Sequence, residues 1–193
     1  MGKNYYTDCL TKHGTTPQGV GWQNAASQKV RFQQFNHLLT TPSILDYGCG
    51  TGDYYTHLKA HGYKGTYHGY DTSPEMIAAA RKQHPNTNFD NNPHNIQNAA
   101  TVIASGLLNH KDNTPNIIWQ KHVDNTLNTL WRYTNHKLAF NALSTFSDPA
   151  GRGDNLYYTD PADILKYCLH ALSPHVTLNH DYGQYDFTIT VRR

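Results

Sequence analysis

A glycine-rich stretch that follows a short apolar run is the part of the sequence best suited to bind a ligand. It runs from Ile44 to Gly52 and reads ILDYGCGTG, so the acidic residue Asp46 precedes three closely spaced glycines. Glycine tolerates positive φ and lets a ligand lie against bare backbone, and a helix that follows presents unpaired N–H groups in its first turn. In a dinucleotide-binding loop the third glycine follows the second by three residues, whereas Gly52 follows Gly50 by two. This spacing disfavours a pyrophosphate and favours a smaller ligand.

A second acidic residue, Asp71, stands 19 residues after Gly52 in the segment YHGYDTSP. At the end of a strand, a carboxylate can accept hydrogen bonds from both hydroxyls of a ribose. Asp, Ser and Thr also favour the first positions of helices, so Asp71 could instead cap the next helix. The succession of a strand, Asp46, the glycines and Asp71 favours a cofactor site over a series of ordinary turns.

The sequence contains 13 histidines, but their spacing does not favour a metal site. His57 and His61 have the i, i+4 spacing that can chelate a metal from one face of a helix. No third ligand is placed, no Glu lies between them, and His61 precedes Gly62 at a helix end, where a partial positive charge is favoured in any case. We therefore expect no metal.

The three cysteines, Cys9, Cys49 and Cys168, are an odd number at unrelated spacings. This pattern fits reduced thiols better than a disulfide framework or a zinc site. Cys49 has no adjacent basic partner that would favour its thiolate, so we expect a packed residue beneath the glycine loop rather than a nucleophile.

The elements that must position these residues follow from periodicity. Short apolar runs alternate with longer amphipathic stretches, which is typical of an α/β sheet. Gly62 is expected to end the first helix of the core, and Pro74 to open the second. The predicted strands are 43–47, 65–70, 87–90, 101–108, 137–144, 176–181 and 187–191, and the predicted helices are 53–60, 73–83, 117–133 and 160–172.

The two ends of the chain differ from this alternation. The last two predicted strands form a hairpin, which adds an antiparallel strand to a sheet that begins as parallel. A pure dinucleotide-binding fold does not require such a strand. Before residue 43, Val30, Phe32, Phe35 and Leu38 have helical spacing, and we expect helices laid over the sheet edge.

Length and charge limit the class of protein. A chain of 193 residues predicts a single domain over 1–193, with a helical lead or lid segment at 1–42 and a cofactor-binding core at 43–193. The net charge is only +2 with no basic run, so no nucleic-acid partner is expected. The apolar run 101–108 is far shorter than the ~20 residues of a spanning helix, and the N-terminus lacks the apolar stretch of a signal peptide. We expect a cytoplasmic protein without membrane contact.

The glycine stretch resembles the first motif of class I S-adenosylmethionine-dependent methyltransferases, a hydrophobic pair followed by D-x-G-C-G-T-G. The resemblance covers roughly residue 43 to the C-terminus, and the lead segment with GVGW at 19–22 is similar to small bacterial proteins of this superfamily. It implies an α/β fold with a Rossmann-like seven-stranded mixed sheet, an antiparallel C-terminal hairpin strand and helices on both faces. That expectation agrees with the hairpin predicted from the residues alone.

The resemblance also implies roles for individual residues. Asp71 would hold the ribose hydroxyls and Met76 would cover the adenine face. Arg31 is a candidate partner for the cofactor carboxylate, or a structural arginine whose stem covers apolar surface. Ala100 and Thr101 stand where the family usually places an acidic residue at the start of the fourth strand. The residues expected to bind the cofactor are Arg31, Asp46, Gly48, Cys49, Gly50, Asp71, Thr72, Met76, Asp90, Ser105 and Gly106.

Ligands of open α/β sheets bind at the carboxyl ends of the strands, so loops there should form the acceptor site. We place His180 at the carboxyl end of the sixth strand, facing the crevice opposite Asn109. There it could take a proton from the nucleophile, or only hydrogen-bond the loop. The expected catalytic residues are Asn109, Tyr158 and His180, and the expected substrate-binding residues are Tyr6, Trp22, Asn141 and Tyr157.

The function that the resemblance implies is methyl transfer from S-adenosylmethionine to a small molecule, with S-adenosylhomocysteine as the product. Two alternatives remain open. One is an enzyme that transfers or cyclises the amino-acid chain of the same cofactor and releases methylthioadenosine, and the other is a protein that binds the cofactor without catalysis. The expected partner is a small-molecule substrate, and the expected state is a monomer or a homodimer.

Overall fold

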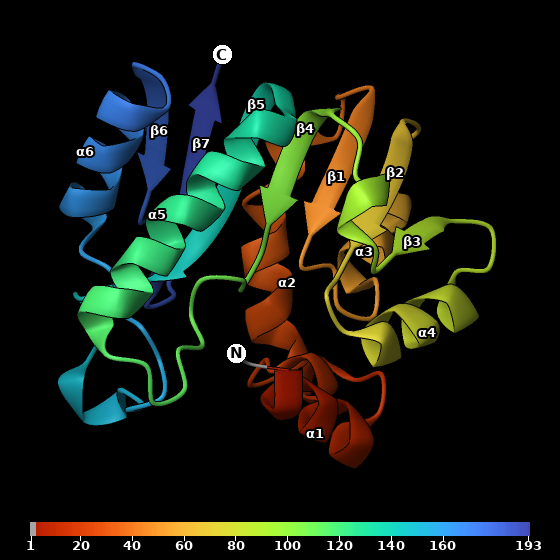
Figure 1. Cartoon of the computed structure of the whole chain (residues 1–193), viewed down its shortest axis with the longest axis horizontal. Coiled ribbons are helices and arrows are strands. Elements are labelled where there is room, and N and C mark those ends of the chain that lie inside the picture. Colours follow the sequence, from red (N-terminus) through yellow and green to blue (C-terminus); the bar gives the residue numbers. More distant parts are fainter. Residues whose placement is uncertain (1–2) are drawn as a thin grey trace.

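Seven strands form one mixed sheet in the order β3-β2-β1-β4-β5-β7-β6 (Figure 1). The computed structural model describes residues 3–193, with side chains from residue 5. All neighbouring strands are parallel except that β7 is antiparallel to both β5 and β6. The predicted antiparallel hairpin strand is therefore confirmed. The strands are β1 (Ser43–Tyr47), β2 (Thr66–Tyr70), β3 (Asn88–Asp90), β4 (Ala99–Ala104), β5 (Thr134–Leu143), β6 (His175–Asn179) and β7 (Asp186–Arg192).

Helices cover both faces of the sheet, as expected. Several helices begin directly after a residue whose side chain caps the first turn. Ser73 accepts a hydrogen bond from the Met76 amide of α4, and Asn24 accepts one from the Ser27 amide of α2. None of the helices in the described range combines the length and hydropathy needed to cross a bilayer. The helices are α1 (Lys3–His13), α2 (Ala25–Gln33), α3 (Asp53–Ala60), α4 (Pro74–Gln83), α5 (Asn116–Tyr133) and α6 (Pro161–Ala171), with short 3-10 helices η1 (Pro17–Val20), η2 (Asn36–Leu38), η3 (Pro93–Asn95) and η4 (Pro149–Gly151).

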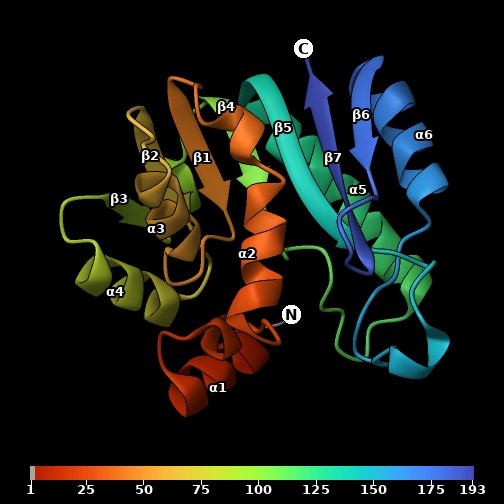
Figure 2. The same ribbon diagram turned by 180° about the vertical axis from the view of Figure 1, so that it is seen from behind.

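The sheet separates two apolar cores because successive side chains of a strand point to opposite faces. Along β4, Val102 and Ala104 pack with the buried residues of α5 and α6, whereas Ile103 packs with those of α2 and α3. Figure 1 shows α5 in front of the sheet, and Figure 2 shows α2 and α3 in front when the molecule is seen from behind. All six residues of β4 are buried, as in a central strand covered on both faces.

Three sequence expectations need correction. Helix α2 does not lie over the sheet edge: Phe32 belongs to the core cluster that contains Ile103 of the central strand β4. The fourth strand ends at Ala104, not at residue 108, because the chain turns at Gly106, where φ is +75°. The fifth strand begins at Thr134, three residues before the predicted start, because it follows α5 without a loop.

Candidate functional site

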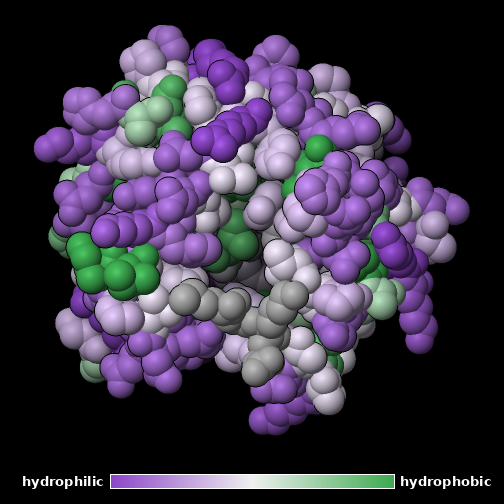
Figure 3. All heavy atoms as spheres, viewed as in Figure 1, coloured by the Kyte–Doolittle hydropathy of each residue, from purple (hydrophilic) through white to green (hydrophobic). Residues whose placement is uncertain are grey.

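A cavity of about 750 Å³ lies where the carboxyl ends of β1, β2, β4 and β5 meet the lead segment. Parallel strands bring these ends to one edge of the sheet, which is the usual ligand position in open α/β folds. Its walls come from α1 and η1, the glycine loop, the start of α4, the loops after β4 and β5, and one face of α5. Figure 3 shows the molecular surface hollowed near the middle of the face seen in Figure 1. The volume is that of a small-molecule site.

The glycine loop adopts the conformation that its composition predicts. Gly48, Gly50 and Gly52 have φ values of +83°, +54° and +85°, which lie in the left-handed region. The amides of Gly48 and Cys49 donate to the Tyr70 carbonyl at 2.7 and 3.0 Å, so the loop is tied to the end of β2. Gly48, Cys49 and Gly50 thereby present backbone to the cavity.

Asp71 connects the glycine loop with the start of α4. Its Oδ2 accepts from the Gly50 amide at 3.0 Å, and its Oδ1 accepts from the Ser73 amide at 2.9 Å. The residue that caps α4 is Ser73, so the alternative role of Asp71 as the helix cap is wrong. Burial raises the pKa of the Asp71 carboxyl, and the backbone hydrogen bonds oppose that shift. Its carboxylate lines the cavity beside Thr72 and Met76.

Asp46 lies deeper in the same wall, with 2% of its surface exposed. Its Oδ2 accepts a hydrogen bond of 2.6 Å from the Tyr67 hydroxyl. Burial raises the pKa of the Asp46 carboxyl to about 7, although the Tyr67 hydrogen bond favours the ionised form. A cationic ligand group in the cavity would offset part of the cost of ionising this side chain.

Cys49 is packed, as expected. The side chain is buried in the core beneath α3, and burial raises the pKa of its thiol well above the ordinary range. A thiol in such surroundings is a poor nucleophile. Among the described residues, no group of His, Cys, Asp and Glu side chains could hold a metal ion.

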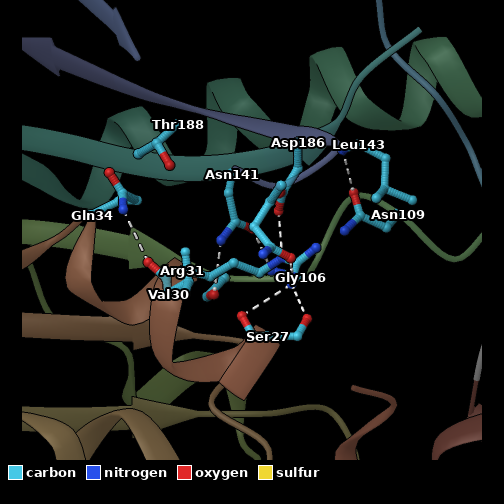
Figure 4. A network of polar contacts seen from close by, with 12 residues as sticks. Ser27, Val30, Arg31, Gln34, Gly106, Asn109, Asn141, Leu143, Asp186 and Thr188 are labelled. Carbon is cyan, nitrogen blue, oxygen red and sulfur yellow. Dashed lines mark hydrogen bonds and ion pairs between the residues drawn. The ribbon is translucent and has the colours of Figure 1, made fainter. Parts of the chain in front are cut away.

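Arg31 lines the cavity but is held by a partner from the far end of the chain. Its Nε forms a buried ion pair with Asp186 at the start of β7, and its Nη1 donates to the Ser27 carbonyl at 3.0 Å (Figure 4). The guanidinium also lies 5.0 Å from the centre of the Trp22 ring. These contacts agree with a structural role for Arg31, which was one of its two predicted roles. The other role, contact with a cofactor carboxylate, stays a prediction.

Two asparagines hold the loop after β4 in place. Asn141 on β5 accepts from the Gly106 amide at 2.8 Å and donates to the Ser105 hydroxyl at 3.0 Å (Figure 4). The Oδ1 of Asn109 accepts from the Leu143 amide at 3.1 Å. Asn109 lines the cavity, whereas Asn141 lies beneath it and is fully buried. The expectation that Asn141 binds substrate is therefore wrong, because its side chain is used to fix the Ser105–Gly106 turn.

The lead segment closes the cavity from the other side. The Tyr5 ring of α1 stacks on His110 with a centroid distance of 3.8 Å. The Trp22 ring lies so close to Gly106 that a Cβ there would be 3.0 Å from its atoms. Tyr6, Trp22 and Tyr158 all line the cavity, and their roles in substrate binding and catalysis stay predictions.

Three further predicted residues do not reach the cavity. Asp90 turns back to accept from the Asn92 amide at 2.7 Å and from Asn95 Nδ2 at 2.6 Å. The Tyr157 hydroxyl donates to Gln120. His180 is exposed just beyond β6, where its ring centroid lies 6.1 Å from that of Phe187 and 6.4 Å from that of Phe146. His180 does not line the cavity as predicted, and its catalytic role stays a prediction.

Helix α5 contributes a wall of the cavity that was not predicted from the sequence. The side chains of this wall have helical spacing. Such spacing indicates that they share one face of the helix, but it does not indicate that this face meets a ligand. A buried apolar face of the same helix packs on the sheet. The cavity-lining residues of α5 are Trp119, His122, Asn125, Thr126 and Thr129.

Comparisons with known proteins agree with this arrangement. Residues 23–166 match a protein-family model described as "Methyltransferase domain". The Mycobacterium tuberculosis protein Rv1506c, which carries a methyltransferase name, is 37% identical over 154 residues, or 78% of this chain and 93% of that protein. The demethylmenaquinone methyltransferase of Chlorobaculum tepidum is 45% identical over 69 residues, which is 35% of this chain and 27% of that protein.

Solved structures share the fold at low identity. The magnesium protoporphyrin IX methyltransferase of Synechocystis with bound S-adenosylhomocysteine has a TM-score of 0.71 at 16% identity, and the match covers 99% of this chain and 97% of that chain. The plantazolicin methyltransferase BpumL, also in complex with S-adenosylhomocysteine, has a TM-score of 0.63 at 13% identity, with 86% of this chain and 84% of that chain covered.

Proposed function

The chain belongs to the methyltransferase-domain family, and on this premise we propose that it transfers a methyl group from S-adenosylmethionine to a small molecule. The observation that carries the proposal is the common wall formed by Asp71 and the bare backbone of Gly48 and Gly50. The S-adenosylhomocysteine in structures of the same fold supports the choice of cofactor.

The side chains of the cavity fit the chemistry of this cofactor. Asp71 offers carboxylate oxygens to ribose hydroxyls while its backbone contacts hold it in place. Asp46 is a buried carboxyl that a nearby positive charge would favour in its ionised form. Met76 is an apolar side chain of the same wall, and apolar surface suits the face of an adenine.

When bound, S-adenosylmethionine supplies a methyl group that the positive charge on sulfur has already activated. The protein then needs to hold the acceptor in line and to exclude water. Asn109 and Tyr158 would orient the acceptor, because both line the cavity outside the glycine loop. Tyr5, Tyr6 and Trp22 would restrict the access of water from the side of the lead segment.

Calorimetry with S-adenosylhomocysteine, S-adenosylmethionine and NAD tests the proposal. We expect both sulfur nucleosides to bind and NAD not to bind. Tight binding of NAD without binding of either sulfur nucleoside would contradict the proposed function. In turnover assays, release of methylthioadenosine in place of S-adenosylhomocysteine would identify transfer of the amino-acid chain instead.

Asp71→Ala should weaken binding of S-adenosylhomocysteine by about 10-fold to 150-fold, because hydrogen bonds to a charged group contribute roughly 1.5 to 3 kcal/mol. Asp90→Ala is the matched control. Asp90 lies at the end of a strand of the same sheet, and its carboxylate accepts from the Asn92 amide and from Asn95 Nδ2 of the loop that follows. An equal effect of both substitutions would remove Asp71 from the cofactor site.

A further inference from the structure

The charged side chains that line the cavity are mostly acidic. Asp46, Asp53, Asp71 and Asp148 contribute carboxyl groups to the wall. Among the described residues, Arg31 is the sole lysine or arginine in the wall, and Asp186 already pairs with it. An acceptor with a negative charge would therefore find no lysine, and no arginine without a carboxylate partner, in the described wall, which disfavours its binding.

A second arginine lies close to the part of the cavity that the loops after β4 and β5 form, which we call the acceptor end, but it is turned to other partners. The Arg152 guanidinium lies 5.3 Å from the centre of the Tyr158 ring. Its Nε donates to the Ser147 hydroxyl at 3.0 Å, and its Nη2 donates to the Ser147 carbonyl at 2.9 Å. These contacts hold the loop after β5, and Arg152 itself does not line the cavity.

Asp148 is the carboxylate of the wall that belongs to the acceptor end. It lies in the loop after β5, on the same segment as the cavity-lining Gly151 and close in sequence to Ser147. Its Oδ1 accepts from the Ala150 amide at 3.0 Å and so begins the short helix η4, which leaves its Oδ2 for other contacts. The side chain is exposed.

The remaining groups at this end are aromatic rings and neutral hydrogen-bond donors. The Tyr158 oxygen accepts from the Gly153 amide at 3.0 Å, so its hydroxyl proton is available to a ligand. The carbonyl oxygen of Asn109 accepts from Leu143, which leaves its amide NH₂. Tyr185 lines the cavity although 60% of it is exposed, and Trp22 lines it as well. Rings of this kind suit a flat ligand.

We propose that the methyl acceptor is an aromatic compound without a negative charge, and that the Asp148 carboxylate is a determinant of this selectivity. The inference rests on the proposed function, because it assigns the substrate class of the same cavity. Stacking attracts an aromatic ligand of any charge, whereas the carboxylates of the wall disfavour a ligand that carries a negative charge.

Three small indoles of matched shape test the charge preference. Tryptamine carries an ammonium group, indole-3-ethanol a hydroxyl group and indole-3-acetate a carboxylate on the same ring. Binding of each probe is measured by calorimetry or ligand-observed NMR on protein saturated with S-adenosylhomocysteine. Saturation is verified first, so failure of the cofactor to bind refutes the proposed function and is distinguishable from failure of the indoles.

We expect tryptamine and indole-3-ethanol to bind at least 10-fold more tightly than indole-3-acetate. Asp148→Asn, which keeps an acceptor for the Ala150 amide, should reduce the ratio of tryptamine to indole-3-acetate affinity at least threefold. Asp160→Asn is the matched control: Asp160 accepts from the Ala162 amide at 2.8 Å in the same way but does not line the cavity. This control should leave the ratio unchanged.

The proposal is overturned if protein saturated with S-adenosylhomocysteine binds none of the three indoles, or binds indole-3-acetate as tightly as tryptamine. It is also overturned if the affinity ratio is the same in the Asp148→Asn variant as in the unsubstituted protein, because another group must then set the preference.

Discussion

Burial determines the ionisation of Asp46. The side chain is 2% exposed, and the pKa of its carboxyl is raised to about 7. An aspartate in an unfolded chain has a pKa of about 3.9. Between these two values the folded state keeps the proton and the unfolded state releases it. The free energy of unfolding therefore falls as the pH rises from about 4 to about 7, and this contribution is constant at higher pH.

Asp46→Asn should remove this pH dependence, because the amide oxygen still accepts from Tyr67 but does not titrate. Between pH 4 and pH 7.5, the free energy of unfolding of the variant should rise relative to the unsubstituted protein by roughly 3 to 5 kcal/mol. Urea unfolding at several pH values measures the difference. Asp154→Asn, at an exposed aspartate, serves as the control. Parallel pH profiles for Asp46→Asn and the unsubstituted protein would contradict the raised pKa.

At the scale of elements, a buried ion pair attaches α2 to the sheet. Asp186 is fully buried at the start of β7, and Arg31 on α2 is 7% exposed. Removal of one partner leaves the other charge without compensation in the interior, which is far more costly than removal of both. A second contact, from the Gln28 amide to Asp53 at 2.8 Å, joins α2 to α3. The position of the lead segment therefore depends on polar contacts as well as on Phe32 and Phe35.

Asp186→Ala should lower the free energy of unfolding by about 3 to 5 kcal/mol, because the Arg31 guanidinium cannot lose its charge. Arg31→Met should cost less, since a buried carboxyl can take up a proton. The double substitution Arg31→Met with Asp186→Leu should recover most of the loss. Denaturant unfolding of the three variants gives these differences. A cost of Asp186→Ala no greater than that of Arg31→Met would show that the pair does not act in this way.

At the scale of the whole molecule, the lead segment and the core share one cavity. Tyr5 stacks on His110, and Trp22 packs on Gly106, so residues from the first 22 positions meet the loop after β4. The lead segment also contributes Phe32 and Phe35 to an apolar core of the sheet. Such shared packing predicts that the two parts unfold together.

We therefore expect a single thermal unfolding transition that shifts as a whole when S-adenosylhomocysteine binds. At a concentration 100 times its Kd, a ligand stabilises the folded state by about 2.7 kcal/mol. For a domain of this size the Tm should rise by roughly 5 to 10 °C. Differential scanning calorimetry tests both points. An early transition that S-adenosylhomocysteine leaves in place would identify the lead segment as a separate unit.

The sequence by itself determined the features that depend on local chemistry. Strand and helix periods located the elements, and the glycines indicated positive φ. The order of Asp46, the glycine loop and Asp71 located the wall of the cavity at which we propose that the cofactor binds. Only the tertiary structure decided which side chains meet. The partner of Arg31 lies 155 residues away in the chain, and Asp90 turns to a loop amide in place of the cavity. His180 directly follows β6, close to its predicted place, yet it does not line the cavity. Local patterns fix the conformation of a segment, whereas contacts between side chains depend on which distant elements pack together.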